Sequence, residues 1–376
     1  MFCLDKSSTI ASNDCLKFKP SNFPELINSY AFRLDLDLGK FYTSTEVSLK
    51  GKDVAYTPAS KGTPKINEGN YFKGNSLLFT MGFSTKGLGI SSTFRRLENM
   101  SSFTDRSFAR PVRNQFKMSS LNFVPSLTKL QDYSLANIYI YQAQPNLIIA
   151  SFAGQAGEIG NQFDFYYNLK KGSFLGGKYG TKIAGNLSYW ALLNAKFNEK
   201  ASTYSVNFLD FGKRLNKDFS VEVRKKWSRK WSSIFTYLNQ TIDKGVALGG
   251  PVGVQGDIKT NIVALESTLK IGSSKSMRFE AQHLSTKKDL KNWAGATLEL
   301  NLGKNFSFYA NDIYNYQTEN KGKRVHYYNF GGSFRKGATR ISVNYGRQRG
   351  GLLCVGGVCR YVSPNTGLTV NINSFF

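Results

Sequence analysis

Two cysteines, Cys354 and Cys359, flank a pair of glycines in the stretch LLCVGGVCR. Adjacent glycines suit a two-residue hairpin turn with positive φ, which would place the cysteines directly opposite each other on paired strands. In that register their Cα atoms lie about 4.5 Å apart, at the short end of what a disulfide spans. The spacing predicts a structural disulfide formed in an oxidising compartment. A metal site would need further ligands, and redox-active pairs usually have the closer C-x-x-C spacing.

Charged residues recur at alternate positions of segments that we interpret as strands, on the side opposite the apolar residues. They are Arg33, Asp35, Asp37, Glu222, Arg224, Glu266, Arg278, Glu280, Glu299 and Arg340. Inside a barrel, these groups either pair across strands and stabilise or close the interior, or give a polar pore with a transverse field. On a soluble sandwich they would be a solvated surface. Paired carboxylates also serve glycosidases, but periodicity gives no distance between them and the sequence shows no sugar platform, so we predict no enzyme.

The two histidines lack the neighbours that catalysis needs. His283 continues the apolar side of a strand, and His326 stands where a strand begins after a loop. A hydrolase would need Ser and His together on one surface, and no nucleophile motif is near either residue. We interpret both as packing residues and predict neither metal nor cofactor.

Strands with one apolar and one polar side must position these residues. In SYAFRLDLDL, for example, Tyr30, Phe32 and Leu34 alternate with Arg33 and Asp35. The same period of two recurs in about fifteen segments, and no segment has a convincing helical period. The sequence therefore predicts an all-β, antiparallel fold.

The connections between these strands alternate in length along nearly the whole chain. Short turns fall at Gly39, Thr85, Ser228, Gly272, Gly303 and Lys336, and long loops at 51–75, 98–160, 193–217, 241–258, 285–292, 316–325 and 350–360. Short periplasmic turns and long extracellular loops are typical of an outer-membrane barrel. Because such barrels have an even number of strands, we predict a transmembrane β-barrel of about 16 strands. The unassigned strand would lie in residues 1–28 or in 98–160, where Tyr133–Tyr141 and Asn146–Gly154 are candidates.

Aromatic residues stand where a membrane interface would need them. Trp227 and Trp231 bracket the turn at Ser228, as in an aromatic girdle, although cross-strand packing in an ordinary hairpin is the alternative. The chain ends GLTVNINSFF, and an alternating last strand that stops on Phe376 resembles the signal for the barrel-insertion machinery. We expect this strand to pair with the first strand and close the barrel.

Composition bounds the class of protein. The 376 residues carry a formal net charge of +25, which attracts anionic lipid, nucleic acid or acidic solutes. No run approaches the roughly 18 apolar residues of a membrane helix. Residues 1–28 lack the basic start and apolar middle of a signal peptide. We divide the chain into two parts: residues 1–28 are an irregular segment or a remnant of missing strands, and residues 29–376 are the barrel domain. The barrel domain includes a long loop or plug at 98–160. The basic, aromatic stretch VRKKWSRKW lies in an alternating hairpin, so we predict membrane anchoring and no nucleic-acid partner.

Two stretches, KGATRISVNYGRQRGGLLCVGGVCRYVSPNTG and KKGSFLGGKYGT, resemble an uncharacterised outer-membrane β-barrel family of Bacteroidota. The resemblance implies an outer-membrane barrel and supplies no biochemical activity. Members of that family are usually longer at the amino end and carry a signal peptide, which implies that this chain is truncated there.

Together these features predict a non-enzymatic outer-membrane barrel. It would act as a channel for small polar or anionic solutes, or as a structural component of an envelope complex. Its expected partners are outer-membrane lipid, lipopolysaccharide, the barrel-insertion machinery and an envelope protein bound by the external loops. The alternative is a soluble all-β protein that binds an anionic polymer.

Overall fold

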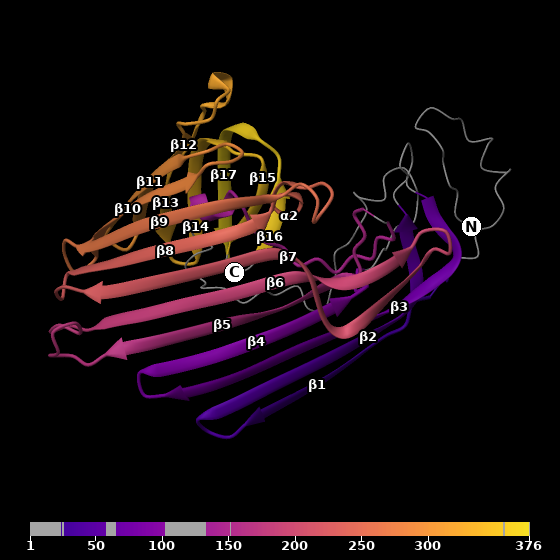
Figure 1. Ribbon diagram of the computed structural model, residues 1–376. Coiled ribbons are helices and arrows are strands. Elements are labelled where there is room, and N and C mark those ends of the chain that lie inside the picture. The colour runs from indigo at the N-terminus through magenta and orange to yellow at the C-terminus, as the bar shows by residue number, and fades with distance from the viewer. Residues whose placement is uncertain are drawn as a thin grey trace.

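The computed structural model describes residues 24, 26–57, 65–101, 133–150, 152–355 and 358–375. One antiparallel sheet of 15 strands runs through them in chain order, and a separate two-stranded hairpin interrupts the order before the last strand (Figure 1). The sheet consists of β1 (Ser29–Asp37), β2 (Phe41–Thr57), β3 (Lys65–Thr85), β4 (Leu88–Glu98), β5 (Gly157–Leu169), β6 (Thr181–Asn198), β7 (Thr203–Lys226), β8 (Trp231–Asp243), β9 (Asp257–Lys270), β10 (Lys275–Thr286), β11 (Trp293–Leu302), β12 (Phe306–Asn315), β13 (His326–Lys336), β14 (Thr339–Gln348) and β17 (Asn365–Ser374). The hairpin is β15 (Gly351–Val355) and β16 (Val358–Val362). The predicted all-β, antiparallel class is confirmed.

The two faces of the sheet differ in the way that the alternating sequence predicts. Along β9, Ile262 and Glu266 are buried on one face, whereas Val263 and Leu265 are exposed on the other. Large apolar side chains are similarly exposed on neighbouring strands; Leu265 is 48% and Phe279 45% accessible. Isolated exposed apolar residues are ordinary, but rows of them on successive strands form a continuous apolar surface.

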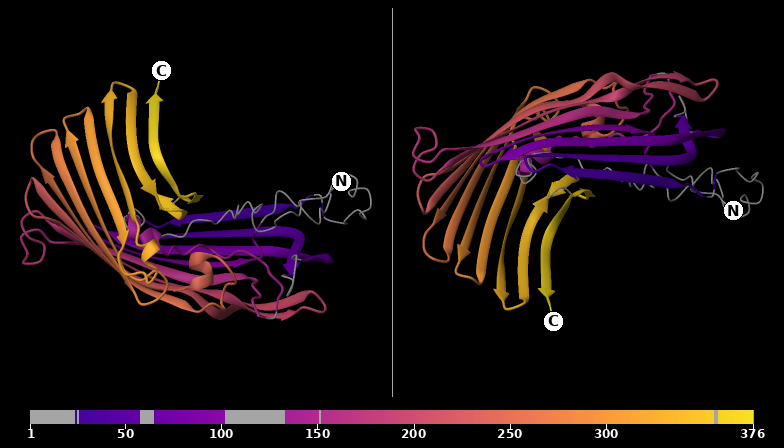
Figure 2. Two further views of the ribbon diagram at one scale, coloured as in Figure 1. Left: turned by 90° about the horizontal axis from the view of Figure 1, so that it is seen from above. Right: turned by 90° about the horizontal axis from the view of Figure 1, so that it is seen from below.

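The sheet curls strongly, so that β14 and β17 turn back toward the side of β1 (Figure 2). β1 and β17 are its two edge strands, and each is paired on one side within the described sheet. The sheet has 15 strands where we predicted about 16. In an up-and-down sheet with an odd number of strands the first and last point the same way, so an antiparallel closure of the described sheet would need one further strand. No pairing joins β1 and β17 in the described sheet, and barrel closure stays a prediction.

Several of the predicted long loops contain regular structure. The segment 193–217 is mostly an extended hairpin, because β6 runs on to Asn198 and β7 starts at Thr203. β2 and β3 likewise extend into 51–75, and 241–258 includes the short helix α2 (Lys244–Leu248), capped by the Asp243 side chain. In the described parts of the chain, no helix has the length and apolarity needed to cross a membrane.

The segment 133–150 does not form the strands predicted at Tyr133–Tyr141 and Asn146–Gly154. It contains the 3-10 helix η2 (Ser134–Asn137) and a single isolated bridge between Ile148 and Gln155. Leu135, Ile138 and Tyr139 pack with buried apolar residues of β8 to β12 in one core cluster: Leu238, Ile242, Ile258, Ile262, Leu284, Trp293 and Ile313. The apolar alternation of this segment thus serves packing against the concave face and not strand pairing.

Candidate functional site

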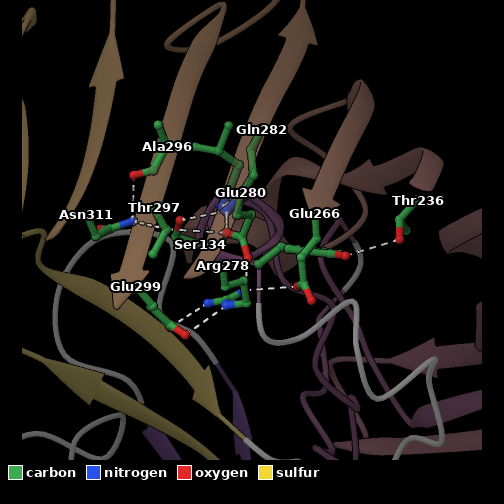
Figure 3. Close-up of polar contacts among 12 residues, drawn as sticks. Ser134, Thr236, Glu266, Arg278, Glu280, Gln282, Ala296, Thr297, Glu299 and Asn311 are labelled. Atoms are coloured by element: carbon green, nitrogen blue, oxygen red, sulfur yellow. Dashed lines mark hydrogen bonds and ion pairs between the residues drawn. The ribbon is translucent and has the colours of Figure 1, made fainter. Parts of the chain in front are cut away.

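A cluster of four charged side chains lies on the concave face where β9, β10 and β11 are adjacent (Figure 3). Arg278 Nη1 lies 2.9 Å from Glu266 Oε2 and 2.7 Å from Glu280 Oε2. Arg278 Nε donates to Glu299 Oε2 at 2.8 Å, and Nη2 donates to the other oxygen of the same carboxylate. One guanidinium therefore serves three carboxylates, one of them in the bidentate geometry that suits arginine.

The strand register explains this arrangement. Arg278 is directly opposite Glu299 on β11, and Glu280 is directly opposite Glu266 on β9. Two carboxylates in direct opposition repel each other, so the neighbouring guanidinium is needed to hold them together. Sequence alternation placed these residues on one face, but only the register brings these four together.

The polar wall continues from this cluster along the concave face. On β7, Arg224 is paired with Glu222, and its Nη2 donates to Glu222 Oε2 at 3.1 Å. Also on β7, Asp218 accepts from the side-chain amide of Asn216 at 2.7 Å. On β5, Asp164 accepts from the side-chain amide of Asn186 at 2.7 Å. Our list of charged wall residues missed Asp164 and Asp218, although both alternate with the apolar residues of their strands.

Residues 133–144, here called the inner segment, cross this face and are fastened to several strands. The Gln282 side chain on β10 accepts from the Leu135 backbone N–H at 2.9 Å and donates to Ser134 Oγ at 3.2 Å. The Tyr139 hydroxyl donates to Asp289 Oδ2 at 2.9 Å. Arg349, which precedes β15, donates to the Asn137 carbonyl at 2.8 Å. The inner segment is thus bound to the wall by polar contacts as well as by the apolar cluster around Leu135.

The other end of the inner segment is bound to a fully buried ion pair. Arg95 on β4 and Glu158 on β5 have no accessible side-chain surface and pair directly. Glu158 also accepts from the Tyr141 hydroxyl and, at 2.7 Å, from the Gln144 backbone N–H. The Cζ atom of Arg95 lies 4.4 Å from the centroid of the Trp190 ring, and Trp190 also stacks on Tyr141. No local pattern pointed to this group, because Glu158 falls inside the predicted loop 98–160 and Arg95 lies on the strand just before it.

Burial changes the acidity of the tyrosines in the inner segment. Desolvation, only partly offset by the hydrogen bond with Thr236, raises the pKa of Tyr133 to about 12. Burial, with the nearby Asp289 carboxylate, raises the pKa of Tyr139 well above its ordinary value. The packed inner segment therefore favours the protonated form of both hydroxyls.

A hollow of about 400 Å³ opens on the concave face of β2 to β7, close to the turn-side ends of these strands. Its polar lining includes Asp164, Lys182, Glu222 and Arg224, and its aromatic lining includes Tyr42 and Tyr166. The hollow therefore combines ring faces with groups of both charges, as binding sites for small polar molecules commonly do.

The remaining predicted wall charges lie apart from the Arg278 cluster. Arg33 and Asp35 form an exposed pair at 2.9 Å on the edge strand β1. Asp37 accepts from the Gly39 N–H at 2.8 Å and stabilises the β1–β2 turn. Arg340 on β14 is opposite Arg335 and reaches Ser333 Oγ at 3.3 Å. These residues do not contribute to one continuous site.

The two cysteines of the predicted disulfide are neighbours, and so are the two tryptophans of the predicted girdle. Cys354 and Cys359 are directly opposite in the β15–β16 hairpin, in the predicted register, while their side chains lie outside the described residues and the disulfide stays a prediction. Trp227 and Trp231 stack with centroids 5.3 Å apart, and both are exposed. Phe376 also lies outside the described residues.

Both histidines are on the exposed side of their strands. His283 Nε2 lies 2.7 Å from the Tyr316 hydroxyl, and His326 Nδ1 lies 2.6 Å from Asp312 Oδ2. His326 also stacks on Tyr314 at 3.9 Å between centroids. In the residues that the structure describes, no group of three or more His, Cys, Asp or Glu side chains is arranged to hold a metal ion.

These faces and this wall define a curved antiparallel β-sheet protein with an apolar convex side and a charged, hydrogen-bonded concave side. The chain belongs to a family of unknown function, DUF6029, whose model matches residues 4–376. No curated protein matches the chain. Our prediction of an uncharacterised family is confirmed, while the Bacteroidota origin and the truncation stay predictions.

Among solved structures, the chain is similar to mutants of a bacterial porin. One mutant of the Rh. blastica porin has 10% identity and a TM-score of 0.34, with 93% of this chain and 89% of that chain covered. A triple mutant of the Rhodopseudomonas blastica porin has 9% identity and a TM-score of 0.32, with 92% of this chain and 89% of that chain covered.

Proposed function

We propose that the protein is an outer-membrane channel for small polar solutes, anionic ones included. The observation that carries this proposal is the opposite character of the two faces of one curved sheet. The convex face exposes rows of apolar side chains, such as Leu265 and Phe279, and the concave face holds the Arg278 cluster and the polar wall. A soluble protein would bury such apolar rows, whereas a lipid-facing barrel surface requires them.

The inner segment narrows the space on the concave side. It lies across the wall from Glu158 on β5 to Gln282 on β10, and its contacts at both ends are with side chains of the sheet. A segment held in this way sets the width of a passage without being part of the wall. We assign to it the role of the predicted plug, as a constriction that leaves part of the lumen open.

The structural role in an envelope complex is the second candidate. It is favoured by the ion pairs on the concave face, where Arg224 and Arg278 are paired with carboxylates. A charge-paired interior stabilises a closed scaffold as well as a pore. In either role the protein is non-enzymatic and lies in the outer membrane, in contact with lipid and lipopolysaccharide, and is inserted by the barrel-insertion machinery. The β15–β16 hairpin carries a Cys354–Cys359 disulfide formed in the periplasm, and the external loops are available to an envelope partner.

Two measurements test the proposal in sequence. The first compares the gel mobility of the detergent-refolded chain with and without boiling; a faster unboiled band is expected of a closed barrel. The second records conductance in planar lipid bilayers, where stepwise currents are expected. A chain that folds without detergent and shows no mobility shift contradicts the barrel, and the anionic-polymer alternative is then tested with nucleic acids and acidic glycans. A folded barrel without current favours the structural role.

A further inference from the structure

We propose that the hollow on the concave face of β2 to β7 is a binding subsite for a small hydroxylated organic anion, such as a sugar acid. The proposal rests on the concave face being the wall of a solute path, and it adds the class of solute. Three features of the hollow indicate this class of ligand. They are two cationic side chains on directly opposite residues of neighbouring strands, two tyrosine rings that lie flat against the sheet, and a set of hydrogen-bonding groups.

The two cations are placed together by the strand register. Lys182 on β6 is directly opposite Arg224 on β7, and both line the hollow. Arg224 is held by Glu222, but Lys182 is held by an aromatic ring: its Nζ lies 4.4 Å from the centroid of Tyr166. An ammonium over a ring face keeps its donors available to a carboxylate. This corner of the hollow therefore attracts an anion.

The tyrosine rings lie against the backbone of the neighbouring strands because glycines stand beneath them. A Cβ added at Gly82 would come within 2.3 Å of the Tyr42 ring, and one added at Gly89 would come within 2.3 Å of the Tyr166 ring. Gly82 and Gly89 are on the paired strands β3 and β4, with Ser84 directly opposite Gly89. The rings thus form a flat, amphipathic floor, with Tyr42 39% accessible.

Asp164 is directly opposite Asn186, four residues along β6 from Lys182, and this part of the hollow suits hydroxyl groups. Asp164 accepts from Gln162 at 2.9 Å and from Asn186 at 2.7 Å, and each carboxylate oxygen can accept a further hydrogen bond. Ser84 and Ser91 also line the hollow. A ligand with a carboxylate at one end and hydroxyls at the other would place the carboxylate at Lys182 and Arg224 and donate its hydroxyls to Asp164. A neutral sugar lacks the first contact, and a simple anion such as acetate lacks the second.

The volume of about 400 Å³ is within the range of pockets for small ligands, roughly 300–1,000 Å³. The hollow is at the turn-side ends of its strands, whereas the inner segment contacts strand ends on the loop side, such as Glu158. A solute that passes the inner segment would reach this subsite afterwards.

The test is isothermal titration calorimetry of the full chain, folded in detergent, with D-glucuronate, D-glucose and acetate. Glucuronate should bind, and glucose and acetate should bind at least about tenfold more weakly, because each lacks one charge-assisted or hydroxyl contact. Lys182→Met should weaken glucuronate binding about tenfold, and Lys182→Arg should restore most of it. Lys275→Met, an exposed cation at the start of β10, is the matched control and should leave binding unchanged.

The proposal is overturned if glucuronate binds no more tightly than glucose or acetate. It is also overturned if titration with glucuronate releases or absorbs no heat of binding, or if Lys182→Met binds glucuronate with unchanged affinity. Tyr42→Leu keeps the charges and removes the exposed ring, so undiminished binding by that variant also counts against the subsite. Calorimetry needs no current, so a barrel that binds glucuronate but does not conduct would contradict the channel alone. A conducting barrel without glucuronate binding would contradict the subsite alone.

Discussion

Arg278 on β10 and Glu299 on β11 face each other directly across the sheet, and both oxygens of the carboxylate accept from the guanidinium. The same guanidinium also contacts Glu266 and Glu280, which are themselves in direct opposition. One side chain therefore compensates the mutual repulsion of three carboxylates on the concave face.

Replacing Arg278 by Met should lower the free energy of unfolding by about 3 kcal/mol, the lower part of the range for breaking a buried ion pair, because the Arg278 side chain is 22% accessible. Urea unfolding in detergent micelles measures the change. Arg340→Met is the control, since Arg340 is exposed and contacts Ser333. Adding Glu280→Gln to Arg278→Met should restore part of the loss, because Glu266 then has a neutral residue opposite. An unchanged unfolding midpoint for Arg278→Met would show that the cluster does not stabilise the wall.

Glu158→Ala should release one end of the inner segment. It removes the acceptor of the Tyr141 hydroxyl and the Gln144 N–H, and it leaves Arg95 buried without its counter-charge. We expect faster chymotryptic cleavage within residues 133–144 and a red shift of Trp190 fluorescence. Glu319→Ala, which removes an exposed partner of Lys291, is the control and should change neither. Larger bilayer currents in Glu158→Ala than in Glu319→Ala are expected if the inner segment is the constriction.

The packing of the inner segment should weaken in alkaline solution. The pKa of Tyr133 is raised by burial to about 12, and that of Tyr139 is raised further in the same direction. Below the ordinary tyrosine pKa of about 10 both hydroxyls are protonated in the packed and released states, so their contribution to packing is fully present. As the pH rises from about 10 toward 12, the released state loses protons first, and release becomes more favourable.

Chymotryptic susceptibility of residues 133–144 against pH measures this effect. Wild-type protein should become susceptible above about pH 10, and the double variant Tyr133→Phe with Tyr139→Phe should show a flatter profile, because its rings cannot ionise. A profile that is equally steep in the double variant would assign the alkaline transition to other groups.

The β15–β16 hairpin should carry a disulfide, because Cys354 and Cys359 are directly opposite. In a Cys3→Ser, Cys15→Ser background, alkylation under denaturing conditions should add no label before reduction and two labels after it. Intact mass spectrometry counts the labels. Labelling of both cysteines without reduction, in protein prepared from an oxidising compartment, would contradict the bridge.

The strands themselves could be predicted from sequence because their signal is local. Alternation along β9 or β10 requires each side chain to face one of two environments, so Leu265 and Glu266 had to fall on opposite sides wherever the strand was placed. Tight turns add a second local signal, and the Gly-Gly pair was sufficient for the register of Cys354 and Cys359. Loop length was a weaker signal, since the extended ends of β6 and β7 have polar sequences like those of loops.

Local alternation and short turns were therefore enough to predict the antiparallel class, the two-faced strands and the face on which Glu266, Arg278, Glu280 and Glu299 lie. Which of these charges meet, how Tyr133–Gln144 packs inside the curved sheet, and how Arg95, Glu158 and Trp190 anchor it follow from the three-dimensional fold. These relationships join residues far apart in the chain, such as Leu135 and Gln282, and depend on register and curvature. Local alternation cannot distinguish an apolar segment that pairs as a strand from one that packs against a face, because both bury every second side chain.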